Sequence, residues 1–163
     1  MIDTATQELT ERLAGAMLKH ELSLVTAESC TGGGIAHSVT SIAGSSGWFD
    51  RGFVTYTNDA KRECLGVSTE TLTNFGAVSE ECAAEMVLGA LQNSHAGIAV
   101  SVTGLAGPGG GSEDKPVGTV CFGWCQRNQS SVTTRVVFEG DREQVRRQSV
   151  LLAMQGLLDM LEA

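Results

Sequence analysis

Histidine is scarce in this sequence, which has three in 163 residues. None of them, His20, His37 or His95, stands at the Cys/His spacing of a zinc site. Two cysteines, Cys121 and Cys125, lie in a strand-like run where four residues span about 13 Å, too far apart for two ligands of one zinc ion. The sequence therefore predicts no metal site.

Basic residues are also in short supply. Lysine and arginine total 11 against 19 aspartates and glutamates, the net charge is -8, and no basic run occurs. Proteins that bind nucleic acid or an anionic membrane need a positive surface, so both partners are disfavoured. A small anionic ligand stays open, because one local pocket can be positive on an acidic protein.

Long apolar runs are missing too, and none reaches the roughly 20 residues that cross a bilayer. The start of the chain, M-I-D-T-A-T-Q-E-L-T, is acidic, whereas a signal peptide begins with basic residues. The five cysteines are odd in number and scattered, which fits reduced thiols. These features predict a soluble, cytoplasmic protein.

The chain length suits one domain, spanning 1–163, because a domain of this size buries roughly two thirds of its unfolded surface. The apolar pattern predicts helices over 4–20, 32–42, 68–74, 79–93 and 141–161, and a short helix with Lys61 after residue 57. It predicts strands over 22–26, 51–57, 97–103, 117–125 and 131–138, the last two as a hairpin. Expected capping signals are Thr4 with Gln7, Asn58 with Asp59, Ser79, and Asp141 with Gln144. This order indicates one α/β domain with a mixed sheet and helices on both faces.

Two glycine-rich turns, Gly32 to Gly34 and Gly104 to Gly111, each follow a predicted apolar strand. In open α/β sheets, ligands bind at the carboxyl ends of the strands. Glycine lets backbone N–H groups approach an anion, and the N-terminus of a following helix adds a favourable dipole. One such turn alone would indicate only a compact fold, but two together predict a ligand pocket.

The specific nucleotide and hydrolase motifs are missing. G-P-G-G-G-S lacks the Gly-Lys-Ser/Thr ending of a P-loop, and its glycines do not have the G-x-G-x-x-G spacing of a dinucleotide site. Ala27 and Thr31 stand where the G-x-S-x-G nucleophile elbow around Ser29 needs glycines. A Ser-His-Asp triad finds no histidine near Ser29 in the sequence, although folding could still bring one close.

Ser29 and Cys30 are both candidate nucleophiles at the end of the first strand. A lysine with a lowered pKa can deprotonate serine, and Lys61, with Tyr56 before it, follows the second strand within reach of this loop. A thiol near a helix N-terminus also has a lowered pKa, which favours Cys30. Neighbouring residues of an extended segment point to opposite sides, so one of the two faces the pocket. For Lys61 a surface charge is the alternative that spacing alone favours, and for Tyr56 it is a half-buried strand residue. The residues alone do not choose between Ser29 and Cys30.

Arg142 lies in the first turn of the last predicted helix, where the helix dipole disfavours a cation. It either forms a surface ion pair with neighbouring acids or holds an anionic ligand with its planar guanidinium. Both alternatives stay open at this point.

Seven motifs run in order along almost the whole chain: A-E-S-C-T-G-G-G (27–34), A-G-S-S-G-W-F (43–49), Y-T-N-D-A-K (56–61), G-A-V-S (76–79), T-G-L-A-G-P-G-G-G (103–111), P-V-G-T-V (116–120) and G-D-R (140–142). With them the sequence closely resembles the CinA C-terminal domain family, whose enzymes are nicotinamide mononucleotide deamidases. The molybdopterin-binding-like domain of longer members is not in the sequence, so the stand-alone form is expected. The resemblance implies a three-layer α/β/α sandwich with a mixed, mostly parallel sheet. It also implies hydrolysis of the nicotinamide carboxamide to nicotinic acid mononucleotide and ammonia.

The resemblance assigns roles to residues: Ser29 as nucleophile, Lys61 as base and Tyr56 as their support. The expected substrate-binding residues are Thr31, Gly32, Gly33, Ser46, Thr103, Gly104 and Arg142. No metal or cofactor is implied, and a homodimer is expected. The alternatives are a nucleotide-binding or regulatory module of the same fold without catalysis, and a hydrolase that uses the Cys30 thiol.

Overall fold

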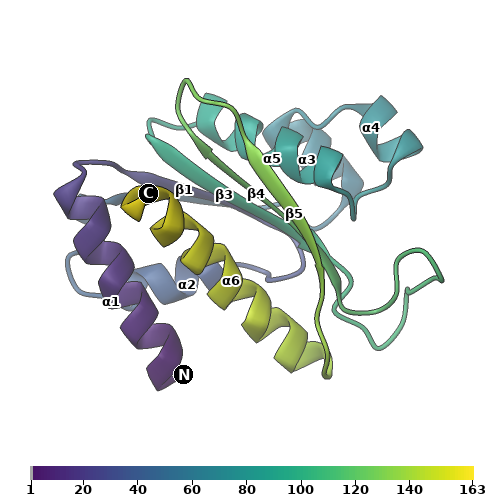
Figure 1. The fold of residues 1–163 in the computed structure, drawn as a ribbon. Coiled ribbons are helices and arrows are strands. Elements are labelled where there is room, and N and C mark those ends of the chain that lie inside the picture. Colours follow the sequence, from purple (N-terminus) through teal and green to yellow (C-terminus); the bar gives the residue numbers. More distant parts are fainter. Residues whose placement is uncertain (1) are drawn as a thin grey trace.

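A five-stranded sheet lies between two layers of helices in the computed structural model, which describes residues 2–163 (Figure 1). The order along the chain is α1 (Thr4–Lys19), β1 (Leu24–Glu28), α2 (Gly34–Thr40), the 3-10 turn η1 (Ser45–Gly47), β2 (Phe49–Val54), α3 (Asn58–Leu65), α4 (Thr69–Asn74), α5 (Glu80–Gln92), β3 (Ile98–Gly104), β4 (Thr119–Gln126), β5 (Val132–Val137) and α6 (Arg142–Glu162). This alternation confirms the predicted single-domain α/β fold.

The strands are ordered β2-β1-β3-β4-β5 across the sheet. The β1 strand pairs in parallel with both β2 and β3, whereas β4 runs antiparallel to β3 and to β5. In the described chain β4 is thus the one strand that runs opposite to the other four. The sheet is mixed and mostly parallel, as expected.

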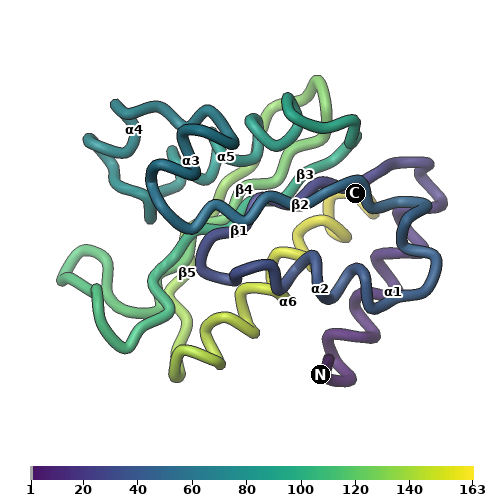
Figure 2. Tube along the Cα trace, turned by 180° about the vertical axis from the view of Figure 1, so that it is seen from behind, coloured from purple at the N-terminus to yellow at the C-terminus, as the bar shows by residue number. Residues whose placement is uncertain are grey.

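The helices divide between the two faces of the sheet. Helices α1, α2 and α6 cover one face and α3, α4 and α5 the other, as the two opposite views show (Figures 1 and 2). The side chains of β1 alternate accordingly: Leu24 joins the apolar cluster under α1 and α6, while Val25 and Ala27 join the cluster under α5. All of β1 is buried, and its carboxyl end leads into the turn that carries Ser29.

Two predicted helix caps are displaced by one residue. Helix α1 is capped by Asp3, whose side chain accepts a hydrogen bond from the Thr6 N–H at 2.8 Å, instead of by Thr4. Helix α3 is capped by Thr57, which accepts from the Ala60 N–H at 3.1 Å, instead of by Asn58 or Asp59. Neighbouring Thr, Asp and Asn residues are all good caps, so the sequence pattern does not separate them.

The other two predicted caps are confirmed. Ser79 caps α5, and Asp141 caps α6 in a capping box with Gln144. The Gln144 N–H donates to the Asp141 side chain at 2.9 Å, and the Gln144 side chain accepts from the Asp141 N–H at 2.8 Å. This box fixes the start of α6, where Arg142 lies.

The first two strands differ from the predicted 22–26 and 51–57 at both ends. Parallel pairing continues along β1 as far as Glu28, opposite Val54 of β2 and Val102 of β3, so the strand ends two residues later than predicted. Strand β2 ends at Val54, so Tyr56 lies in the loop after it. As a consequence Glu28 is a buried strand residue and the turn begins at Ser29.

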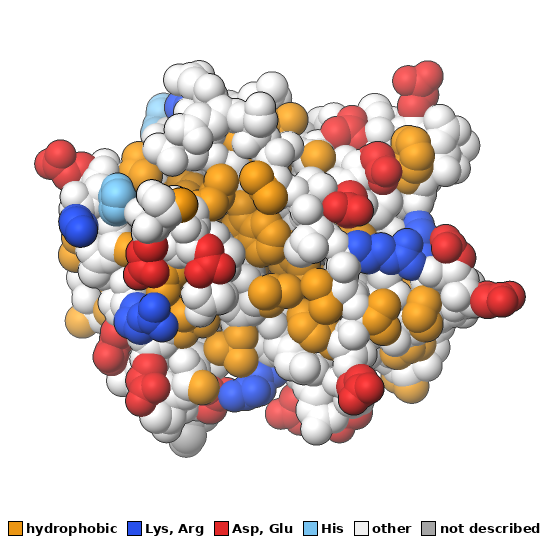
Figure 3. Space-filling view, in the orientation of Figure 1, with side chains coloured by type: hydrophobic (Ala, Val, Ile, Leu, Met, Phe, Trp, Pro, Cys, Tyr) orange, Lys and Arg blue, Asp and Glu red, His pale blue; other side chains and the backbone are white. Residues whose placement is uncertain are grey.

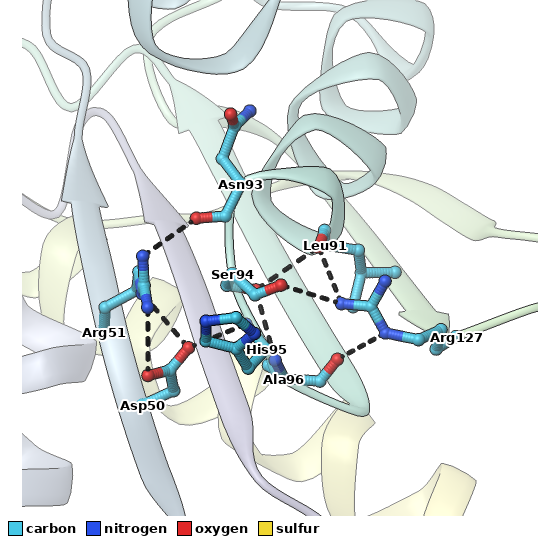
Figure 4. A network of polar contacts seen from close by, with 8 residues as sticks. All are labelled: Asp50, Arg51, Leu91, Asn93, Ser94, His95, Ala96 and Arg127. Atoms are coloured by element: carbon cyan, nitrogen blue, oxygen red, sulfur yellow. Dashed lines mark hydrogen bonds and ion pairs between the residues drawn. The ribbon is translucent and has the colours of Figure 1, made fainter.

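Polar contacts hold the opposite, amino end of the parallel strands (Figure 4). Arg127 donates hydrogen bonds to the carbonyl groups of Leu91, Ser94 and Ala96, where α5 turns into β3. Nearby, the Asp50 carboxylate accepts from the His95 N–H at 3.0 Å, and Arg51 donates to the Asn93 carbonyl at 3.1 Å. We call these residues the amino-end network, and it fixes the loop between α5 and β3.

The charge of the surface matches the acidic composition. In the space-filling view, acidic side chains are scattered around the rim of this face and apolar side chains gather at its centre (Figure 3). The exposed apolar residues of the edge strand β5 include Val132 and Val137. Within residues 2–163, each helix is too short or too polar to cross a lipid bilayer.

Candidate active site

A cavity of about 290 Å³ opens at the carboxyl ends of the parallel strands, where the two glycine-rich turns were expected to meet. Residues from five separate segments line it: Ser29, Cys30, Tyr56, Asn58, Lys61, Ala77, Val78, Thr103, Gly104, Leu105, Ala106, Gly107, Gly109 and Arg142. The loop between β3 and β4 projects from the sheet at this end (Figure 2). A larger surface hollow of about 570 Å³ lies between α1 and the end of α6, and it contains none of the predicted site residues.

Ser29 and Lys61 form the centre of the cavity although they are 32 residues apart in the chain. The Lys61 Nζ lies 3.0 Å from the Ser29 Oγ, and it donates a second hydrogen bond to the Thr55 carbonyl at 2.9 Å. The two meet because β1 and β2 are neighbouring parallel strands whose carboxyl ends lie at the same edge.

Burial shifts the pKa of Lys61. The side chain is 2% exposed, and desolvation lowers its pKa below the ordinary lysine value. Among the described residues, no carboxylate forms an ion pair with it. A lysine in this setting is suited to take a proton from the adjacent hydroxyl, so Lys61 is not the surface charge that spacing alone favoured.

Cys30 has the opposite electrostatic character to the one expected from its place before a helix. Its side chain is 5% exposed and belongs to the apolar cluster under α1 and α6, although the residue also lines the cavity. Burial, the largest effect, raises the pKa of this thiol to about 12. The expected lowering of the Cys30 pKa is therefore wrong, because desolvation outweighs any helix dipole.

Glu28 supports the turn after β1, a role that the sequence did not reveal. Its carboxylate is fully buried and accepts hydrogen bonds from the Thr31 hydroxyl at 2.6 Å and from the N–H groups of Ile35 and Ala36 at 2.8 and 3.0 Å. The first turn of α2 is thus neutralised from within the protein. The Glu28 carboxylate occupies the N–H groups of Ile35 and Ala36, so these two donors are not available to a bound anion.

Three predicted substrate-binding residues, Thr31, Gly32 and Gly33, shape the turn but do not line the cavity. The Thr31 side chain is 2% exposed and donates its hydroxyl hydrogen to Glu28. Gly32 and Gly33 have φ angles of 58° and 95°, in the left-handed region that favours glycine. The glycines are needed here to turn the chain from β1 into α2.

Arg142 and Tyr56 meet at the mouth of the cavity. The Arg142 guanidinium donates to the Tyr56 hydroxyl at 3.0 Å and to the Gly107 carbonyl at 2.8 Å, joining α6, the loop after β2 and the glycine-rich loop. No carboxylate within residues 2–163 pairs with Arg142, so the surface ion pair considered above is not formed. Tyr56 is 57% exposed, more open to solvent than a half-buried strand residue.

Of the remaining predicted residues, Thr103 and Gly104 line the cavity and Ser46 does not. The Thr103 hydroxyl donates to the Ala77 carbonyl at 2.9 Å, which ties β3 to the segment before α5. A Cβ atom at Gly104 would lie 2.7 Å from a methyl group of Val120, so the packing of β4 requires glycine. Ser46 is exposed in η1, which leads into the first residues of β2 at the opposite end of the sheet.

Arg146 is a second residue that the sequence did not single out. Its guanidinium donates to the Cys30 carbonyl at 3.1 Å and to the Thr31 carbonyl at 3.3 Å. The signal was present in the sequence, because Arg142 and Arg146 are four residues apart and therefore share one face of α6. Residues 2–163 contain no group of three His, Cys, Asp or Glu side chains that could hold a metal ion.

Comparisons with known proteins agree with these observations. The profile of the CinA C-terminal domain matches residues 6–161. The chain is 50% identical over 157 residues to the nicotinamide-nucleotide amidohydrolase PncC of Escherichia coli K12, covering 96% of this chain and 95% of that protein. It is 47% identical over 152 residues to PncC of Pseudomonas putida, covering 93% and 94%. The crystal structure of a competence/damage inducible protein from Agrobacterium tumefaciens superposes with a TM-score of 0.96 at 48% identity, covering 100% of this chain and 99% of that one. This chain belongs to the CinA C-terminal domain family.

Proposed function

We propose that this chain is a nicotinamide-nucleotide amidohydrolase, which converts nicotinamide mononucleotide to nicotinic acid mononucleotide and ammonia. The relatives named for this activity align over nearly their whole length at about half identity. The observation that carries the proposal is the 3.0 Å contact between the Lys61 Nζ and the Ser29 Oγ in a cavity. The whole chain, 1–163, acts as one amidohydrolase domain in this proposal.

The reaction begins with proton transfer from the Ser29 hydroxyl to neutral Lys61. The Ser29 Oγ bonds to the carboxamide carbon, and the carbonyl oxygen takes the negative charge in the tetrahedral intermediate. The C–N bond then breaks, and ammonia leaves with the proton that Lys61 had accepted. Water attacks the resulting ester, releases the acid and returns the proton to Ser29. The Thr55 carbonyl, 2.9 Å from Nζ, holds the amine in place during both steps.

The oxyanion is held by backbone N–H groups at the start of the turn. The Gly32 N–H is not one of them, because it donates to the Ser29 carbonyl at 2.9 Å. The N–H groups of Cys30 and Thr31 have no acceptor among the described residues, and Cys30 lines the cavity. We therefore assign the oxyanion to these two groups, each worth about 3 kcal/mol in comparable sites. Thr31 itself does not line the cavity, but its N–H belongs to the same peptide unit as the carbonyl of Cys30, which does line it.

The phosphate lies at the other end of the cavity, near Arg142. Ala106, Gly107 and Gly109 line the cavity, and their N–H groups have no acceptor in the described part of the chain. Together with the guanidinium they offer both charge and hydrogen-bond donors to a phosphate. Tyr56, whose hydroxyl accepts a hydrogen bond from Arg142, relays the proton that Lys61 accepted to the departing ammonia and supplies no second proton.

Ammonia release from nicotinamide mononucleotide tests this function. Ser29→Ala should abolish release, because the nucleophile is lost, whereas Cys30→Ala should largely spare it. The reverse pattern would overturn the serine mechanism and favour the thiol hydrolase. Binding of the nucleotide with no turnover by the wild-type protein would instead favour the non-catalytic module.

Assembly and location complete the proposal. We propose a homodimer, for which the exposed apolar residues of the edge strand β5 are one available surface, and light scattering in solution tests it. A cytoplasmic location fits the five free cysteines, because thiols persist in a reducing compartment.

A further inference from the structure

The turn that carries the nucleophile, residues 29–33, is held from two sides. From inside, the buried Glu28 carboxylate binds the Thr31 hydroxyl and the first turn of α2. From outside, Arg146 of α6 donates to the carbonyl groups of Cys30 and Thr31 at 3.1 and 3.3 Å. Nothing in the proposed reaction so far uses Arg146, although it contacts the two residues that follow Ser29.

The planarity of the peptide bond transmits this contact to the reacting side of the turn. The Cys30 carbonyl and the Thr31 N–H belong to one trans peptide unit, so they point in opposite directions. Because Arg146 holds the carbonyl toward α6, the Thr31 N–H points away from α6. Helix α3, with Lys61, lies on the opposite face of the sheet from α6 (Figure 1). The Thr31 N–H has no acceptor within residues 2–163.

The charge of Arg146 reinforces the geometry. In the described chain no carboxylate lies within ion-pairing distance of Arg146, so its positive charge acts on the two carbonyl groups that it contacts. A cation on a carbonyl oxygen polarises the whole peptide unit and makes its N–H a stronger donor. The group that is strengthened is one of the two assigned to the oxyanion.

We infer that Arg146 is a positioning residue for this hydrolysis, which orients and polarises the Thr31 N–H through the Cys30 carbonyl and so strengthens the oxyanion site. The inference rests on the proposed function. It predicts that Arg146 affects the transition state more than the binding of substrate, since the oxyanion forms only during the reaction.

The test compares Arg146→Ala with Arg147→Ala in steady-state ammonia release from nicotinamide mononucleotide. Arg147 is the matched control, because it is the next residue on the same helix and pairs with Asp3 at the surface. We expect kcat to fall roughly 10- to 100-fold in Arg146→Ala with KM nearly unchanged, less than the loss of a direct oxyanion donor. Arg147→Ala should keep the wild-type kcat.

Three further measurements separate positioning from a structural role. Millimolar methylguanidinium should restore part of kcat in Arg146→Ala, but should restore nothing in Ser29→Ala. The pH dependence of kcat should keep its wild-type midpoint, because Arg146 contacts neither the Lys61 amine nor the Ser29 hydroxyl. Arg146→Lys should retain an intermediate kcat, since one ammonium cannot hold both carbonyl groups as the guanidinium does.

The inference is overturned if Arg146→Ala has the wild-type kcat. It is also overturned if kcat falls together with an equal rise in KM and methylguanidinium restores none of it. A shifted pH midpoint also overturns it, because Arg146 would then act through Lys61. These outcomes leave the proposed function standing. That function fails separately, when the wild-type protein itself releases no ammonia.

Discussion

The two ends of the parallel strands use similar residue types but differ in how many polar groups have partners inside the protein. At the amino end, Arg127 meets three carbonyl groups and Asp50 meets an N–H and a guanidinium. At the carboxyl end, Lys61 is buried without a carboxylate, and the N–H groups of Cys30 and Thr31 have no acceptor in the described chain. Buried polar groups without partners reduce stability, and they are therefore typical of functional sites.

Measurements of activity and stability should distinguish the residues at the two ends of the strands. Substitutions at the carboxyl end should reduce activity and leave stability nearly unchanged. Substitutions in the amino-end network should reduce stability and leave kcat unchanged. A variant that lowers both kcat and the free energy of unfolding would contradict this division between the two ends.

Lys61→Met should have the largest effect. The side chain keeps a similar length and loses the amine, so kcat for ammonia release should fall about 10²–10⁴-fold, the range for a general base. The free energy of unfolding should stay within about 2 kcal/mol of wild type, because removing a desolvated amine offsets the lost hydrogen bond to the Thr55 carbonyl. Ammonia assays and urea denaturation measure the two quantities.

Lys19→Met is the control for that variant, since Lys19 is exposed at the end of α1 and outside the cavity. It should leave kcat at the wild-type level and lower the free energy of unfolding by at most about 1 kcal/mol, because Lys19 lies in the last turn of α1. Near-normal turnover in Lys61→Met would show that another group deprotonates Ser29.

Arg127→Ala should have the next largest effect, on stability alone. It removes hydrogen bonds from a charged group to three carbonyls at the end of α5, including Leu91, where a cation also offsets the helix dipole. The free energy of unfolding should fall by about 1–3 kcal/mol, and kcat should not change. A lysine can reach fewer of the carbonyl groups, so the free energy of unfolding of Arg127→Lys should lie between those of wild type and Arg127→Ala. A loss of kcat at full stability would contradict the division.

Helices, strands and turns at both ends of the sheet were predicted well from the sequence. The side-chain contacts formed there were predicted less well. The order of helices and strands, the capping box at Asp141 and the glycine-rich turns followed from local patterns. The pairing of Ser29 with Lys61 came from the family resemblance, because their contact depends on β1 lying beside β2. The spacing of residues along the chain does not predict which strands are neighbours in the sheet.

The remaining errors have a common physical origin in tertiary burial. The Cys30 thiol was expected to be acidic because it precedes a helix, but α1 and α6 cover it and exclude water. Glu28 was missed because the strand was ended two residues early, which placed it in a loop instead of under α2. The burial of Cys30 depends on α6, more than a hundred residues away. The burial of Glu28 depends on the exact pairing of β1. Local sequence patterns do not predict either.

Asp50→Asn should have the smallest effect, and it tests the charge of the amino-end network through pH. The hydrogen bond from the His95 N–H, with a smaller effect of Arg51, lowers the pKa of Asp50 in the folded protein. The stabilisation is therefore present above the unfolded value of about 3.9 and is lost as the pH falls through the lower folded pKa. Because the pair with Arg51 is partly exposed, the free energy of unfolding at neutral pH should drop by less than about 1 kcal/mol. Urea denaturation at neutral pH and at steps below about pH 4 should show the difference from wild type shrinking with acidity. Asp114→Asn on the exposed loop is the control, and a difference for Asp50→Asn that does not change with pH would show that the carboxylate charge contributes nothing here.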